Sequence, residues 1–161
     1  MKIFEFLFSS KKDNKAPAPS KSSGLQKADF YIAGVPYYTK NIEKIGIKNP
    51  DYDKDYAELC DEDHPIRKIY RYKYINKPVY LIPEPTNPHD KNAIMVQIAG
   101  QQVGHIKSDE TELVQTLLKK NVKYISSYIS GGPYKIVYSN GNENILEDHL
   151  SVSVRIAYTE G

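Results

Sequence analysis

Residues 81–106, LIPEPTNPHDKNAIMVQIAGQQVGHI, decide how the rest of the chain is interpreted. The second half holds two apolar runs, residues 93–98 and 101–106, and their separation by Ala99-Gly100 predicts two strands joined by a tight turn. The first half, Pro83–Asp90, holds three prolines together with a Glu, an Asn, a His and an Asp. Proline restricts its own φ and the residue before it, so we expect a stiff loop that presents polar groups beside the hairpin.

Similar patterns on both sides of this hairpin predict a mainly β (α+β) fold. Apolar or alternating runs predict further strands at 30–35, 66–75, 78–82, 122–129, 134–138 and 150–158, and turn-like interruptions at 130–133 and 139–144. Helical spacing predicts a short helix at 41–45 and longer ones at 50–61 and 109–120, the last with a reciprocal cap between Asp109 and Glu112. Many short strands with one or two helices favour a small, partly open β-barrel over a parallel sheet.

The first part of the chain differs from the rest. Residues 1–8 are apolar but too short for a secretory signal or a membrane span, so no transmembrane segment is expected. Residues 9–27 are rich in Ser, Lys, Ala and Pro without periodicity, which predicts a flexible tether. We therefore divide the chain into this N-terminal tail, 1–27, and a folded domain, 28–161.

Charge is unevenly distributed. The net charge is +2, but six lysines against Glu5 and Asp13 give residues 1–27 a net +4, so the other 134 residues sum to −2. Because a protein that grips a DNA backbone normally has a basic face, a nucleic-acid site in the folded region must be local. The single cysteine excludes an intrachain disulfide and a cysteine-rich zinc site, and the absence of an export signal makes the cytoplasm the expected compartment.

Catalysis is not expected. Glu84, His89, Asp90 and His105 are residue types that bind cations and move protons, and they keep a metal-dependent hydrolase open as an alternative. Their spacing, however, matches no zinc or nuclease arrangement, and no Ser/His/Asp or Cys/His set stands out. No phosphate-binding loop is present, so we expect no ATP motor, no cofactor and no metal.

The stretch EPTNPHDKNAIMVQIAGQQVGHI resembles the core of the HIRAN domain. That family carries roughly Glu-Pro-x-Asn-Pro-x-Asp-x-Asn-Ala-Ile, then a strand, then a Gly-x-x-Val-Gly-(His/Tyr)-(Ile/Leu) strand, and GVPYY at 34–38 resembles its first strand. The resemblance covers roughly residues 28–158, with 40–75 expanded. It implies an OB-like barrel that binds DNA; in eukaryotic fork-remodelling enzymes HIRAN domains capture the 3′ end of single-stranded DNA.

The resemblance also implies site residues. Tyr37 matches an aromatic ring that stacks on the terminal base, Asn87 and Asp90 match polar loop positions at the 3′ end, and His105 matches a site residue on the following strand. The chain departs from the family at three positions: Pro36 stands in place of an Arg, His89 in place of a second stacking Tyr, and Ser108 in place of a basic residue. Apart from the resemblance, Lys91, Lys107 and Arg71 are candidate phosphate contacts by their charge, with little support from their positions in the sequence.

The residues themselves leave other roles open. Asp90 and Asn92 can cap the turn into the next strand, Asn87 can be purely structural, and His105 can be a satisfied structural histidine. Tyr37 and Tyr38 point to opposite faces if extended, so one of them packs inside. A rival function is a protein-interaction adaptor that uses a Tyr-rich sheet surface, with the apolar segment 1–8 anchoring a protein partner.

Overall fold

The computed structural model describes residues 24–160 and shows a mainly β chain, as predicted. Residues 1–23, which include the apolar segment and most of the predicted tether, lie outside the described part. The strands are β1 (Gln26–Ala33), β2 (Ile47–Lys48), β3 (Ile66–Tyr70), β4 (Tyr72–Lys73), β5 (Val79–Pro83), β6 (Ile94–Ile98), β7 (Gln101–Ile106), β8 (Asn121–Tyr138) and β9 (Glu143–Thr159). The helices are η1 (Val35–Tyr38), α1 (Thr39–Ile45), η2 (Pro50–Asp53), α2 (Tyr56–Leu59) and α3 (Thr111–Leu118).

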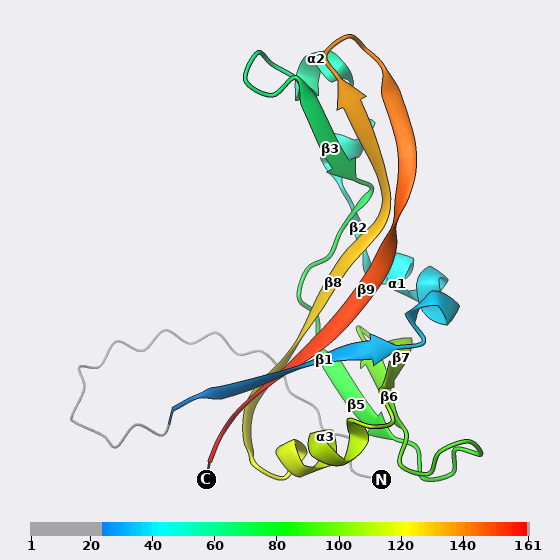
Figure 1. Cartoon of the computed structure of the whole chain (residues 1–161), viewed down its shortest axis with the longest axis vertical. Coiled ribbons are helices and arrows are strands. Elements are labelled where there is room, and N and C mark those ends of the chain that lie inside the picture. Colours follow the sequence, from blue (N-terminus) through cyan, green and yellow to red (C-terminus); the bar gives the residue numbers. More distant parts are fainter. Residues whose placement is uncertain (1–23, 161) are drawn as a thin grey trace, which may run out of the picture.

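Seven strands form one antiparallel sheet in the order β3-β8-β9-β1-β7-β6-β5, and β2 pairs with β4 separately. The sheet is not closed, since β3 and β5 are its two edges. β1 joins the β3-β8-β9 part of the sheet to the β7-β6-β5 part. Its residues 26–31 pair with β9, whereas Ile32 and Ala33 pair with β7. This confirms the prediction of a mainly β, partly open fold (Figure 1). No helix within residues 24–160 is both long and apolar enough to cross a bilayer.

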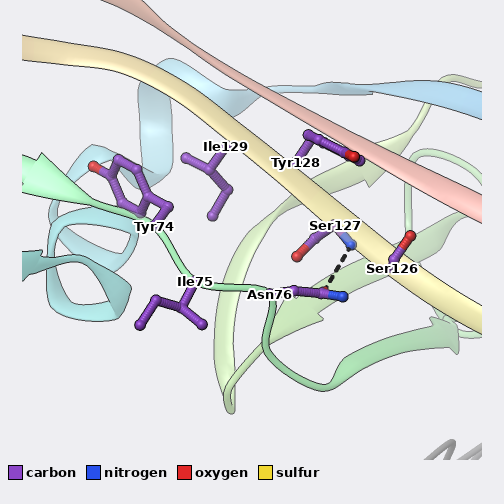
Figure 2. A pocket seen from close by; sticks show the side chains of 7 residues that line it. All are labelled: Tyr74, Ile75, Asn76, Ser126, Ser127, Tyr128 and Ile129. Atoms are coloured by element: carbon purple, nitrogen blue, oxygen red, sulfur yellow. Dashed lines mark hydrogen bonds between the residues drawn. The ribbon is translucent and has the colours of Figure 1, made fainter. Parts of the chain in front are cut away.

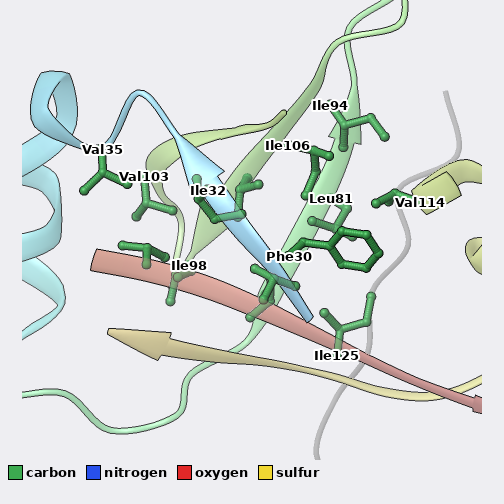
Figure 3. Packing of buried hydrophobic residues seen from close by; sticks show 14 of the residues in the cluster. Phe30, Ile32, Val35, Leu81, Ile94, Ile98, Val103, Ile106, Val114 and Ile125 are labelled. Carbon is green, nitrogen blue, oxygen red and sulfur yellow. The ribbon is translucent and has the colours of Figure 1, made fainter. Parts of the chain in front are cut away.

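The core follows from the two-residue period of the strands. In β6, Ile94, Val96 and Ile98 are fully buried, while the residues between them are half-buried. Val114 and Leu117 of α3 add a helical stripe to the same cluster. Figure 3 shows how these side chains meet those of β1, β5 and β7. The core therefore forms beneath the predicted hairpin and holds β6 and β7 in place.

The turn predicted at 130–133 is wrong. Those residues lie inside β8, where Gly131 and Gly132 have φ of 91° and 87° and the pairing with β9 shifts register. A Cβ at Gly131 would lie 2.0 Å from the carbonyl oxygen of His149, so only glycine fits there. The glycines make a bulge that bends a long strand instead of reversing it. The reversal occurs at 139–142, inside the second predicted turn. We call β3 and the β8–β9 hairpin beyond Gly132 the arm (Figure 1).

Two helix predictions need correction. Residues 50–61 form η2 and α2 instead of one helix, because the Asp55 side chain accepts from the amides of Ala57 and Glu58 and starts a new helix. The helix predicted at 109–120 covers only 111–118, and its N-cap, Glu110, makes no side-chain cap, so the expected Asp109–Glu112 cap is absent. The predicted strand at 66–75 is also divided, into β3 and β4.

We expect Tyr74→Phe to stabilise the protein by about 1 kcal/mol, because a buried polar group without a partner destabilises the folded state. The Tyr74 hydroxyl is buried and has no hydrogen-bond partner among residues 24–160, and this burial raises the pKa of Tyr74 to about 12. Since the folded state favours the neutral phenol, wild-type stability should fall relative to the variant as pH rises from 10 towards 12. Urea unfolding across this pH range measures both effects. Tyr38→Phe is the matched control and should destabilise, because the Tyr38 hydroxyl accepts a bond of 2.8 Å from Gln102 Nε2.

Candidate nucleic-acid interface

The loop between β5 and β6 is held at its base by backbone hydrogen bonds. The amide of Glu84 donates to the carbonyl of Ala93 at 2.9 Å, and the amide of Ala93 donates to the carbonyl of Asp90 at 3.1 Å. A third bond, from the Asn87 amide to the Glu84 carbonyl at 2.9 Å, forms a turn within the loop. Together with three prolines, these bonds restrict the backbone before any ligand arrives.

Asn87 holds the tip of this loop from within. Its Oδ1 accepts from the amides of His89 at 2.9 Å and Asp90 at 3.2 Å, and its Nδ2 donates to Glu84 Oε2 at 3.3 Å. Both ends of the side-chain amide are therefore occupied. The structural role that the sequence left open for Asn87 is present, and it positions the two residues that follow.

His105 ties the loop to the sheet. Its Nε2 lies 2.8 Å from Glu84 Oε2, and the two side chains are 29% and 27% exposed. On the neighbouring strands, Ala33 and Met95 stand opposite His105. The sequence raised Glu84 only as a metal or hydrolytic candidate and did not indicate this contact, because it joins residues from the start of a loop and a later strand.

Asp90 caps a turn and still presents a carboxylate oxygen. Oδ1 accepts from the amide of Asn92 at 2.8 Å, whereas Oδ2 accepts no hydrogen bond from the described residues. The side chain is half-buried, and the neighbouring His89 is exposed. The capping role and a binding role are thus compatible in one residue, since one oxygen serves each.

Tyr37 projects from η1, which follows a turn at Gly34 with φ of 78°. Its side chain is 89% exposed, while the neighbouring Tyr38 is half-buried and bonded to Gln102. The expectation that one of the pair packs inside assumes an extended chain; residues 35–38 instead form a 3-10 helix, and Tyr38 is half-buried rather than in the core. An exposed ring of this kind is available for stacking on a base.

A hollow of about 390 Å³ adjoins Tyr37. It is lined by Pro36 and Thr39 on one side and by Glu147, Asp148, His149 and Leu150 of β9 on the other. The sequence did not indicate His149 as a site residue, because no residue near it in the sequence belongs to a recognisable site. Only the pairing of the sheet brings this part of β9 to η1.

The predicted phosphate contacts separate into two groups. Lys91 on the loop and Lys107, two residues beyond His105, are both exposed at the end of the sheet that carries the loop. Arg71 lies between β3 and β4 instead, where its Nη2 is 3.4 Å from the Tyr52 hydroxyl and its guanidinium stands 5.3 Å from the ring centre. The structure therefore does not bring Arg71 together with the loop.

The cavity beside β8 is separate from the predicted site residues. A cavity of about 220 Å³ between β8 and residues 74–76, in which the Ser127 amide donates to Asn76 Oδ1 at 3.3 Å, is not lined by any predicted site residue (Figure 2). Within residues 24–160, no three His, Cys, Asp or Glu side chains gather in a way that could hold a metal ion. The predicted site is an open surface and not an enclosed pocket.

Comparison with known families finds one match. The family model of the HIRAN domain matches residues 26–155, which is nearly the whole described chain. No curated protein and no solved structure matches the chain significantly. The match spans the strands, the loop and η1, and so includes every residue of the surface described above.

Proposed function

Because the chain belongs to the HIRAN domain family, a DNA-binding family, we propose that it binds DNA by recognising the free 3′ end of a single strand. The observation that supports this proposal is that the family match includes both an exposed ring on η1 and an available carboxylate oxygen on the β5–β6 loop. Tyr37 is 89% exposed, and Asp90 Oδ2 is not bonded by any described residue. A ring can stack on a base of any sequence, and a carboxylate can accept a hydrogen bond from a terminal hydroxyl.

The carboxylate provides selectivity for an end. In the middle of a strand it would face a phosphate, and the two negative charges would repel each other. At a 3′ terminus it meets a hydroxyl donor instead. The site therefore needs no strongly basic face, in keeping with the net −2 of residues 28–161.

The remaining residues support this contact. His89 stacks beside Tyr37, Asn87 and the Glu84–His105 pair hold the loop, and Lys91 and Lys107 contact phosphates. Pro36 and Ser108 carry no positive charge at positions where the end-binding members of the family have basic residues. We therefore expect a modest affinity for the DNA end. The role we propose involves no catalysis, cofactor or metal, and its setting is the cytoplasm.

Fluorescence anisotropy with linear and circular forms of one short oligonucleotide tests the proposal. The two forms share sequence and length and differ by only one phosphate, but only the linear form has ends. We expect the linear form to bind at least tenfold more tightly, and a block on its 5′ end to leave binding unchanged. The difference should persist at two salt concentrations, whereas attraction by the Lys-rich tail should weaken with salt. Equal affinity for both forms would refute end recognition.

A second candidate, an adaptor for another protein, is favoured by one face of the arm. Ile66 and Leu146 are 57% and 45% exposed there, and the register places Tyr134 opposite both Tyr70 and Leu146. Capture of one stoichiometric protein by the wild-type chain, lost in Leu146→Asp and accompanied by no affinity for DNA, would favour this function over the first.

A further inference from the structure

Two tyrosines flank a narrow slot on the outer face of the sheet. Tyr31 of β1 and Tyr128 of β8 both stand opposite Ser153 of β9, so the three side chains share a face. The two rings are 62% and 63% exposed. Neighbouring strands lie about 4.8 Å apart, so the two tyrosine backbones are separated by about 10 Å with only a serine between them. The hollow at this place has a volume of about 300 Å³. In Figure 1 these three strands run side by side where β1 meets the β8–β9 hairpin.

The lining of the slot is polar and carries a fixed cation. Ser151 and Ser153 line it, and Arg155 lies in the next row of β9. Arg155 donates to both carboxylate oxygens of Asp29, at 2.6 and 2.8 Å, and its guanidinium is 5.6 Å from the centre of the Tyr128 ring. The bond to Arg155 is the main cause that lowers the pKa of Asp29, and the charge of Lys27 adds to it. The charges of Arg155 and Asp29 balance within the lining, and Lys27, two residues before Asp29 on β1, adds one cation beside it.

We propose that this slot is a second binding site, which takes a base of a single DNA strand whose 3′ end lies on the β5–β6 loop. The inference rests on the function proposed above and adds a place for the strand beyond its terminus. A flat base stacks at a distance of about 3.5 Å from an aromatic ring. If the two tyrosine rings lean towards each other until they are about 7 Å apart, one base fits between them. Serine hydroxyls can donate to or accept from any base edge, so the slot would tolerate any sequence.

The position of the slot relative to the loop supports a continuous path. Tyr31 precedes Ala33 by two residues, so both point to the same face of β1, about 6.5 Å apart along the strand. Ala33 stands opposite His105, which is bonded to the loop through Glu84. A strand that starts at Asp90 and crosses β1 therefore reaches the slot within a few nucleotides. Lys27, beyond Asp29 on β1, can contact its phosphates, and the serine and ion-pair lining offers little to an apolar protein segment.

Oligothymidylates of three and ten nucleotides, both with a free 3′-hydroxyl, test this inference in anisotropy titrations on the full chain. We expect the longer strand to bind wild type about tenfold more tightly. The double variant Tyr31→Ala/Tyr128→Ala should bind the trinucleotide as wild type does but lose the gain from length. Tyr31→Phe/Tyr128→Phe should retain most of the gain, because the rings remain, and thermal melting of both variants checks that they fold.

Each outcome separates the slot from the end site. No gain with length in wild type, or a gain that survives in the alanine variant, would overturn the slot and leave end recognition standing. Tyrosine-dependent binding of the ten-nucleotide strand that is equal for its circular form would support the slot and refute end recognition. If neither oligonucleotide binds, both proposals fall.

Discussion

Asp90→Asn is expected to weaken binding of a strand with a 3′-hydroxyl by about tenfold and to remove most of the discrimination against a 3′-phosphate. A hydrogen bond to a charged acceptor contributes about 1.5–3 kcal/mol, and a neutral amide oxygen retains roughly half of that, which corresponds to about a tenfold loss. The same change removes the repulsion of a terminal phosphate, so the affinity for the phosphorylated strand should rise. In the wild type the Asn92 amide donates to Asp90 Oδ1 at 2.8 Å; asparagine at position 90 keeps an oxygen that can accept this bond, and so preserves the loop.

Anisotropy titrations give, for each protein, the ratio of its affinity for the 3′-hydroxyl strand to its affinity for the 3′-phosphate strand. The change in this ratio between wild type and variant measures the effect. Asp109→Asn is the matched control, because Asp109 is an exposed carboxylate just after β7 that takes no part in the loop. It should leave the preference for hydroxyl over phosphate unchanged. An equal loss of affinity for both termini in Asp90→Asn would show that Asp90 acts only through loop structure.

Gly104→Ala should cause a large loss of stability, about 3–5 kcal/mol. Gly104 has φ of 149°, and a Cβ there would lie 2.3 Å from the carbonyl oxygen of Ala33 and 2.5 Å from Cγ2 of Ile32. Backbone strain costs about 1–3 kcal/mol and overpacking about as much again. Because a typical domain is stable by only about 5–15 kcal/mol, the variant would be partly unfolded under mild conditions. Urea unfolding followed by circular dichroism measures the loss.

Gly100→Ala separates the two causes of this effect. Gly100 also has a positive φ, 76°, but nothing lies within 4 Å of a Cβ built on it. Its replacement should therefore cost only about 1 kcal/mol, from backbone strain alone. If both variants lose the same stability, the close approach of β1 to β7 is not what makes glycine necessary at 104.

The parts of the fold that follow from local pattern could be predicted from sequence. Ile94, Val96 and Ile98 alternate with polar or flexible residues, and all three are fully buried as that period requires. The turn at Ala99-Gly100 joins β6 to β7 as expected. The backbone restriction of the preceding loop follows from proline chemistry. The different exposure of Tyr37 and Tyr38 does not follow from an extended chain, because they lie in a 3-10 helix.

Features that depend on pairing between strands far apart in the sequence could not be predicted. Gly131 and Gly132 suit a turn as well as a bulge, and the choice is made by the His149 carbonyl of another strand. The contact of His105 with Glu84, and the slot formed by Tyr31 and Tyr128, likewise need the sheet order before they can be seen. Arg71 is a candidate phosphate contact by its charge alone, and the structure places it between β3 and β4, beside Tyr52 and away from the loop.

The pairing of β1 with both β9 and β7 also affects the order in which the protein folds. Gln26 stands opposite Tyr158, so the first strand of the sheet must wait for almost the last residues of the chain before its pairing with β9 can form. Closing so long a loop costs conformational entropy before the contacts that stabilise it have formed. Chains dominated by such distant contacts therefore fold slowly. The local hairpins β5–β6–β7 can assemble early, with the β5–β6 loop already in place. The three-strand slot is then completed last, when β9 arrives.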